Sequence, residues 1–342
     1  MRPGPRNLIT DVDGIRVGNA ADTRVWTGVT VVLPDRPAVA AVDVRGGAPG
    51  TRETDALNPS CLVDRVDAVV LSGGSAFGLE AASAAATWLA ARGRGYEVGP
   101  VRVPIVPAAI LFDLLNGGDK AWGENPPFSA LARSACETVS LEFGLGNVGA
   151  GYGAKAGDLK GGLGSASLVT GDGLQVGALI AANPFGSAVM PGQATLWAWA
   201  LELAGEMGGQ PLPTGPVPPD AGLPDHVIAR AGAKAGANTT IGVVAVNADL
   251  TKAEALRLAT MAHDGLARAV RPAHTPFDGD TLYVLATGTR PLPEPRPYHL
   301  ARLGAHAADV AARAVARGVY HAETLGPFPA YRERFASVLT RP

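Results

Sequence analysis

The sequence predicts an α/β protein in which several strands are covered by helices on both outer faces. Two observations support this class. Short apolar, β-branched segments recur along the chain and end at glycine or proline, and longer segments with helical periodicity stand between them. No shift in composition divides the 342 residues, so we expect a single domain spanning 1–342.

The first half of the chain is expected to consist mainly of short strands. Apolar runs at 28–33, 38–44 and 68–71 predict strands, and Pro104 and Pro107 interrupt a further run at 101–115. Helices are expected at 79–91 and 126–139. The glycine turn at 72–78 between a strand and a helix lacks the spacing of a phosphate-binding loop, so no nucleotide site is expected there.

The second half is expected to alternate more regularly. Strands are predicted at 166–170, 174–182, 240–246 and 282–286, and helices at 250–269 and 298–317. Thr251 and Glu254 have the spacing of a capping box at the start of the first of these helices. The Pro- and Gly-rich stretch 190–225 is expected to be a surface loop with a helical turn or two near Trp197 and Trp199, and to be disordered or to form an oligomer contact.

Composition excludes several classes of function. The net charge of −2 and the pI near 6.3 give no basic surface for nucleic acid or membrane. No apolar run is long enough to cross a membrane, and the N-terminus lacks a signal-peptide core, so a cytoplasmic protein is expected. Cys61 and Cys136 fit neither a disulfide framework nor a zinc site, and both are expected to be buried. No metal and no cofactor are predicted.

Asn238-Thr239 is the dipeptide that points most directly to chemistry. A run of small residues at 232–237 precedes it and an apolar strand follows it. Thr239 could attack the carbonyl group of Asn238 and, after hydrolysis of the resulting ester, become a new N-terminus. Its free α-amine, with an ordinary pKa of about 7.7–8.0, could then serve as the base for its own hydroxyl. A turn followed by a strand is the ordinary alternative.

A pair of carboxylates follows downstream of this dipeptide. Asp278-Gly279-Asp280 stands directly before the predicted strand at 282–286. Two acids at a strand end can hold an α-ammonium group and orient a threonine hydroxyl. Because Asp-Gly is also a strong turn signal, a plain β-turn is the alternative.

Segments spread over nearly the whole chain carry a resemblance to one known family. In order they are DVDGIRVG at 11–18, LSGGSAFGL at 71–79, GNVGAG at 146–151 with LKGGLG at 159–164, ANPFG at 182–186, NTTI at 238–241 and HTPFDGDT at 274–281. Together they resemble the L-aminopeptidase/D-esterase family of self-processing N-terminal-nucleophile hydrolases. That family includes β-peptidyl aminopeptidases and nylon-oligomer hydrolases.

The resemblance implies a fold and an assembly. It implies a four-layer αββα sandwich, with two β-sheets between helical layers. It also implies autocleavage into an α chain, 1–238, and a β chain, 239–342, and a homo-oligomer of four αβ protomers.

The resemblance also implies roles for particular residues. Thr239 would be the nucleophile, Asp278 and Asp280 would position its amine and hydroxyl, and Asn183 would stabilise an oxyanion. Lys160 would supply a positive charge near the nucleophile. Lys155 lies close by, but Lys160 is preferred because Gly161-Gly162 follows it.

The expected substrate pocket involves Phe112 and the glycine turn Gly73, Gly74 and Ser75. Phe112 stands where nylon-oligomer hydrolases carry tyrosine, and no acid occurs at 106–109 to receive a substrate ammonium group, although Asp113 is near. The implied function is therefore a broad amidase or aminopeptidase for small aminoacyl, β-aminoacyl or ω-amino acid amides, acting on a small molecule or short peptide. Blocking the substrate amine is expected to reduce turnover only modestly.

Two other functions fit the same features. A related self-cleaving family, the ornithine acetyltransferases, passes the acyl group to an amine instead of water. The other alternative is a non-enzymatic binding protein that keeps the fold but does not cut its own chain.

Overall fold

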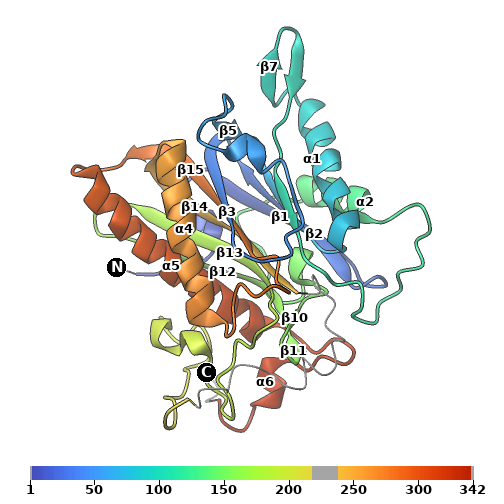
Figure 1. The fold of residues 1–342 in the computed structure, drawn as a ribbon, viewed down its shortest axis with the longest axis vertical. Coiled ribbons are helices and arrows are strands. Elements are labelled where there is room, and N and C mark those ends of the chain that lie inside the picture. The colour runs from blue at the N-terminus through green and yellow to red at the C-terminus, as the bar shows by residue number, and fades with distance from the viewer. Residues whose placement is uncertain (1, 218–237, 340–342) are drawn as a thin grey trace.

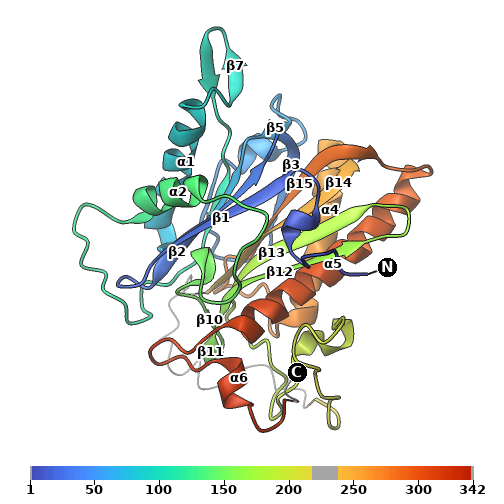
Figure 2. The same ribbon diagram turned by 180° about the vertical axis from the view of Figure 1, so that it is seen from behind.

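The computed structural model describes residues 2–217 and 238–339, and two β-sheets lie between two layers of helices in it (Figures 1 and 2). The αββα layering expected from the family resemblance is therefore confirmed. The run 232–237 and the last part of the expected loop at 190–225 lie outside the described residues.

The first half of the sandwich consists of a five-stranded sheet and the two helices that cover it. The strand order is β1 (Ile15–Asp22), β2 (Thr27–Pro34), β6 (Val69–Ser72), β9 (Ala108–Ile110) and β4 (Thr51–Arg52). Its outer face is covered by α1 (Glu80–Ala90) and α2 (Phe128–Glu137). Because α1 turns four alanines, at 81, 82, 84 and 85, into the protein, it packs closely on the sheet.

The other half consists of a six-stranded sheet that contains the predicted cleavage site. Its order is β12 (Gly162–Val169), β13 (Gln175–Asn183), β14 (Thr239–Asp249), β15 (Thr281–Pro291), β3 (Ala38–Val44) and β5 (Arg65–Val66). Only the β14–β15 pair is parallel, and α4 (Lys252–Ala269) makes the crossover between these two strands. With α5 (Arg296–His321), α4 covers the outer face.

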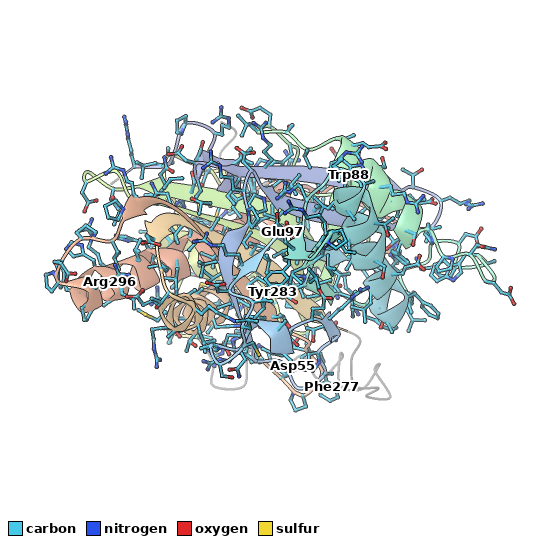
Figure 3. All side chains as sticks on the ribbon, turned by 90° about the horizontal axis from the view of Figure 1, so that it is seen from above. Asp55, Trp88, Glu97, Phe277, Tyr283 and Arg296 are labelled. Carbon is cyan, nitrogen blue, oxygen red and sulfur yellow. The ribbon has the colours of Figure 1, made fainter. Side chains whose placement is uncertain are left out.

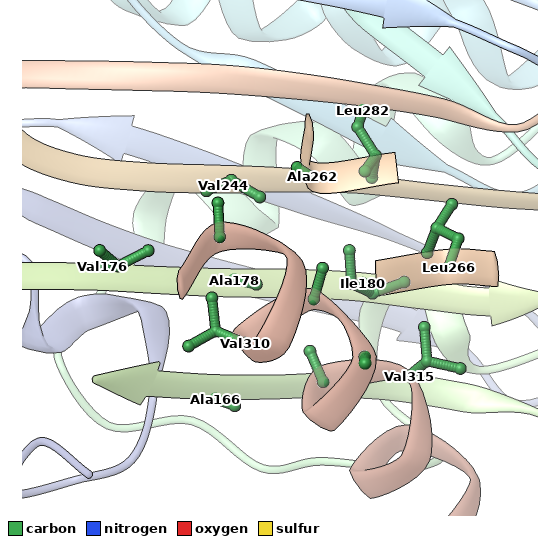
Figure 4. Packing of buried hydrophobic residues seen from close by; sticks show 14 of the residues in the cluster. Ala166, Val176, Ala178, Ile180, Val244, Ala262, Leu266, Leu282, Val310 and Val315 are labelled. Atoms are coloured by element: carbon green, nitrogen blue, oxygen red, sulfur yellow. The ribbon is translucent and has the colours of Figure 1, made fainter. Parts of the chain in front are cut away.

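Alternation along the strands divides the core between two interfaces. On β14, Val243 and Ala245 face the opposite sheet, whereas Val244 and Val246 face the helices. Figure 4 shows the helix side, where Val310 and Val315 of α5 lie over the six-stranded sheet.

The two sheets are also joined by a polar contact. The hydroxyl of buried Tyr283 on β15 donates to the carbonyl oxygen of Ala108 on β9 at 2.7 Å. Tyr283 lies near the middle of the molecule in Figure 3. This bond fixes the six-stranded sheet, which carries the predicted nucleophile, against the five-stranded sheet.

Short elements complete the structure. They are the hairpins β7 (Tyr96–Val98) with β8 (Val101–Val103) and β10 (Lys155–Ala156) with β11 (Leu159–Lys160), the helix α6 (Tyr331–Arg334), and the 3-10 helices Ile9–Asp11, Asp55–Leu57, Ser75–Leu79, Gly149–Gly151 and Trp197–Leu201. The helical turn expected near Trp197 and Trp199 is confirmed.

Both cysteines were predicted to be buried, and the structure confirms this for one of them. Cys136 is buried on α2, as expected, but Cys61 is exposed and the prediction for it is wrong. Cys61 lies in the loop that follows Asp55–Leu57, and its side chain is exposed there. In the described part of the chain, no helix has the length and apolarity to span a bilayer.

Candidate active site

Three strand ends bring the predicted catalytic residues to one edge of the six-stranded sheet. Thr239, the first residue of β14, pairs with Asn183, the last residue of β13. On the other side, Asn238 forms a parallel bridge with Asp278, just before β15 begins. Residues 56 and 40 positions apart in sequence therefore meet because β13, β14 and β15 are neighbours.

The peptide bond between Asn238 and Thr239 is buried and its carbonyl oxygen has two donors. The Thr239 hydroxyl donates to the Asn238 carbonyl oxygen, and the backbone N–H of Gly279 donates to the same oxygen at 3.1 Å. A Cβ at position 279 would lie 2.8 Å from the Thr239 hydroxyl oxygen, so only glycine permits this approach. The hydroxyl thus lies beside the carbonyl it would have to attack.

Asp280 is buried close to Thr239, the predicted nucleophile, and both of its carboxylate oxygens accept hydrogen bonds. Oδ1 accepts the backbone N–H of Thr240 at 2.7 Å. Oδ2 accepts from the backbone N–H of His274 at 3.1 Å and contacts the ring Nδ1 of His274 at 2.8 Å. Asp280 is therefore tied to the residue that follows Thr239.

Asp278 is fully buried and equally constrained. Oδ1 accepts the backbone N–H of Phe185 at 2.9 Å, and Oδ2 accepts the backbone N–H and hydroxyl of Thr275 at 2.9 and 2.6 Å. Burial raises the pKa of Asp278, and the nearby charge of Asp280 raises it further. Two adjacent carboxyl groups of this kind can divide the roles of acid and base.

Asn183 is fully buried and its amide group is oriented by backbone partners. Its Oδ1 accepts the N–H of Lys155 at 2.9 Å, and its Nδ2 donates to the carbonyl oxygen of Phe112 at 3.2 Å. An amide nitrogen has two hydrogens, so one remains for another acceptor. That is the neutral donor an oxyanion site requires.

A cavity opens beside Asn183. Its empty volume, which includes space open to solvent, is about 300 Å³. It is lined by Phe112, Asp113, Leu115, Asn116, Gly153, Lys155, Asn183 and Phe328. Phe112 lines this cavity together with Asn183, and its place in a substrate pocket stays a prediction.

The glycine turn does not line this cavity as the sequence suggested. The backbone N–H of Gly74 donates to Asp113 Oδ1 at 2.8 Å, and that of Ser75 donates to the carbonyl oxygen of Leu111. A Cβ on Gly73 would lie 2.2 Å from Asp113 Oδ2, and one on Gly74 would strike the Phe128 ring. The glycines permit close packing against Asp113 and Phe128.

Asp113 is the acidic group of the cavity. Only 3% of its surface is exposed, and its Oδ2 accepts the Thr27 hydroxyl at 2.6 Å. Burial raises the pKa of Asp113, whereas the bonds from Thr27 and Gly74 and the charge of Lys120 oppose that rise. The carboxyl group is therefore fixed in place where it meets the cavity.

The two candidate lysines have different environments. Lys160 is fully buried and its Nζ donates to the carbonyl oxygens of Gly151 and Gly161 at 3.1 and 2.7 Å. Burial lowers the pKa of Lys160 to about 7, although the charge of Asp113 opposes this. Lys155 instead lines the cavity, and burial lowers its pKa as well. The structure thus gives Lys155, the less favoured candidate, the more direct access to the cavity.

Sequence reasoning missed several site residues. Phe328 reaches the cavity from the C-terminal end, and no local motif marked it. Leu115 ends the apolar run at 101–115 and Asn116 follows it, and neither carried a signal. Within the described ranges, no group of three or more His, Cys, Asp or Glu side chains could hold a metal ion.

Comparison with known proteins identifies the family. Residues 7–330 match the model of peptidase family S58. An uncharacterized aminopeptidase of Mycobacterium tuberculosis is 44% identical over 351 residues, covering 96% of this chain and 98% of its own length. A 6-aminohexanoate-oligomer endohydrolase of Kocuria sp. is 30% identical over 297 residues, covering 85% of this chain and 78% of its own length.

Solved structures agree on the fold. The L-aminopeptidase D-Ala-esterase/amidase of Ochrobactrum anthropi, described as a variant of the Ntn hydrolase fold, aligns with a TM-score of 0.72 at 22% identity over 99% of this chain and 96% of its own. A β-aminopeptidase of Burkholderia sp. aligns with a TM-score of 0.69 at 22% identity over the same shares. With its nucleophile candidate at the start of a central strand, this chain belongs to peptidase family S58 and is an amide hydrolase with the N-terminal-nucleophile hydrolase fold.

Proposed function

We propose that this protein cuts its own chain between Asn238 and Thr239, and that the freed Thr239 hydrolyses amide bonds through an acyl-enzyme. One observation carries the proposal. The Thr239 hydroxyl and the Gly279 N–H both contact the carbonyl oxygen of Asn238, at the buried end of a central strand.

The processing reaction needs only the groups at this edge and one water molecule. The Thr239 hydroxyl oxygen attacks the Asn238 carbonyl carbon, and the Gly279 N–H donates to the oxygen that gains negative charge. The C–N bond breaks, the nitrogen takes up the hydroxyl proton, and an ester joins Asn238 to the Thr239 side chain. Water then hydrolyses the ester, leaving a carboxylate on Asn238 and a free amine on Thr239.

The same groups serve the second reaction. The Thr239 hydroxyl attacks the substrate carbonyl carbon, its proton passes to the α-amine, and the substrate amine leaves with a proton to give an ester that water hydrolyses. Asp278 and Asp280 hold the new ammonium group and orient the hydroxyl. Asn183 donates its remaining amide N–H to the substrate oxyanion.

The cavity defines the acyl group that the enzyme accepts. It adjoins Asn183, and its lining includes a fixed carboxyl group, Asp113, and the apolar side chains of Phe112 and Phe328. We assign it to a small aminoacyl, β-aminoacyl or ω-amino acid group, with Asp113 receiving the amine. The curated relatives named for aminopeptidase and 6-aminohexanoate-oligomer hydrolysis support this class.

We also infer a homo-oligomer of four αβ protomers from the family resemblance. Light scattering of the purified protein should give about four times the 34.8 kDa of one chain. A mass of one or two chains would contradict this assembly.

Matched anilide substrates test the catalytic proposal. A free aminoacyl, β-aminoacyl or ω-aminoacyl anilide should be hydrolysed, and its N-acetylated form should have a kcat/KM at least ~10-fold lower, because Asp113 then loses a charged partner. Asp113→Asn should remove this difference between the two forms. Thr239→Ala should abolish all turnover.

Two results would count against this assignment. Equal turnover of free and acetylated substrates would support the broad amidase expected from the sequence. Transfer of the acyl group to an added amine, with no free acid formed, would favour the acyltransferase alternative.

A further inference from the structure

Among the described residues, one side chain forms a hydrogen bond with the carboxylate of Asp280. It is the ring of His274, a residue with no role in the mechanism above. The His274 ring Nδ1 lies 2.8 Å from Asp280 Oδ2, and the His274 backbone N–H donates to the same oxygen at 3.1 Å. A carboxylate only accepts hydrogen bonds, so the Nδ1 atom carries a hydrogen. One residue therefore holds one oxygen of Asp280 twice.

The backbone of His274 makes this double contact possible. Its φ of +57° lies in the left-handed region, which most side chains avoid and which histidine and asparagine tolerate better. In this conformation its main-chain and ring nitrogens converge on the same Asp280 oxygen. The other oxygen stays free to accept the Thr240 N–H at 2.7 Å.

A second histidine supports the ring of His274 without competing for Asp280. The His263 ring lies edge-on to it with centroids 4.9 Å apart, and His263 Nε2 lies 2.9 Å from the Asp43 carbonyl oxygen. Burial lowers the pKa of His263 to about 4, so this ring is neutral near pH 7. The carbonyl requires the hydrogen on Nε2, and the buried Nδ1 has no partner among the described residues.

We infer that His274 is the positioning residue for Asp280, fixing its carboxylate so that one oxygen holds the N–H of Thr240 and thereby the backbone of Thr239. The inference rests on the proposed function, because Asp280 acts on Thr239 in it. His274 acts through Asp280 and touches neither substrate nor scissile bond. Loss of its ring lets the carboxylate rotate, and misplacement of a catalytic group by about 1 Å can cost ~10²-fold in rate.

Two substitutions separate positioning from stability. His274→Gly tolerates the positive φ and keeps the backbone N–H but removes the ring. His274→Asn also tolerates it and can place an amide nitrogen where Nδ1 lies. The readouts are the rate of chain cleavage in freshly made protein, kcat and KM of the processed enzyme, and the thermal midpoint.

The expected result is a loss in kcat that asparagine restores. His274→Gly should lower kcat and the cleavage rate ~10–10²-fold with KM nearly unchanged, and His274→Asn should recover most of both. If His274→Gly does not fold, His274→Asp replaces it, because aspartate has the shape of asparagine but offers no amide hydrogens. A His274→Gly enzyme with wild-type kcat, or an asparagine variant no better than glycine, would overturn the inference.

Asp280→Asn distinguishes failure of this inference from failure of the proposed function. If Asp280→Asn is impaired but His274→Gly is not, only the positioning role is lost. If Asp280→Asn cleaves itself and turns over substrate like the wild type, the assigned role of Asp280 is wrong and the inference fails with it.

Discussion

At the residue scale, the peptide bond proposed for cleavage, between Asn238 and Thr239, already has the attacking hydroxyl and a backbone donor beside its carbonyl group. The Asn238 carbonyl oxygen accepts from both the Thr239 hydroxyl and the Gly279 N–H. The sequence indicated Thr239 and the two acids, because they follow recognisable motifs. It did not indicate the Gly279 N–H, because a backbone donor leaves no mark in residue identity beyond the glycine itself.

Lys160 gives a pH dependence whose sign follows from burial. Its pKa of about 7 lies below the ordinary 10.5, so the unfolded chain binds more protons between these values. The free energy of unfolding should therefore rise from pH 7 toward pH 10, by at most about 1.4 kcal/mol per pH unit. Urea unfolding of wild type and Lys160→Met at pH 7 and 9 measures this, and the difference between the two proteins should change with pH. A constant difference would contradict a neutral buried Lys160.

At the scale of elements, the strands and helices that the sequence patterns predict agree well with those of the structure. The run at 38–44 is β3 to the residue, and the capping box predicted at Thr251 and Glu254 starts α4. The two-residue strands β4, β5, β10 and β11 were not predicted, because two residues have no periodicity. The pairing of strands into two sheets came from the family resemblance, since alternation does not say which strands are neighbours.

The α4 cap provides a local stability test. The Thr251 hydroxyl accepts the Glu254 N–H at 3.2 Å, and a Glu254 oxygen accepts the Thr251 N–H at 2.9 Å. Thr251→Ala should lower the free energy of unfolding by about 1 kcal/mol. Thr260→Ala on the same helix is the matched control, because its hydroxyl donates to the Leu256 carbonyl oxygen within the helix and alanine is the better helix former. Equal losses of unfolding free energy for Thr251→Ala and Thr260→Ala would contradict the stabilising role of the Thr251 cap.

At the scale of the whole molecule, the two proposed fragments share one structure. β14 and β15 of the second fragment lie between β13 and β3 of the first. A buried ion pair also crosses between them, since Glu206 Oε1 lies 2.5 Å from Arg313 Nε, and Glu206 Oε2 lies 3.6 Å from Arg317 Nε. Cleavage should therefore leave the two chains associated.

Loss of one partner from this buried ion pair should weaken that association strongly. Glu206→Gln leaves Arg313 buried without its charge partner and should cost roughly 3–5 kcal/mol. Asp309→Asn, which breaks the exposed pair with Arg268, should cost less than about 1 kcal/mol. Urea unfolding of the processed protein, followed by native size analysis, compares the two. A loss of unfolding free energy for Glu206→Gln that is no larger than that for Asp309→Asn would contradict the role of Glu206 in holding the two fragments together.

The measurement that tests the central claim most directly is mass spectrometry with N-terminal sequencing of the purified protein. We predict two co-purifying fragments, 1–238 and 239–342, dividing the 34.8 kDa of the chain roughly as 24 to 11, with the smaller one beginning Thr-Thr-Ile-Gly. Thr239→Ala should remain one intact chain. A small fragment with any other first residue, or an intact wild-type chain that still hydrolyses anilides, would contradict Thr239 as the self-generated nucleophile.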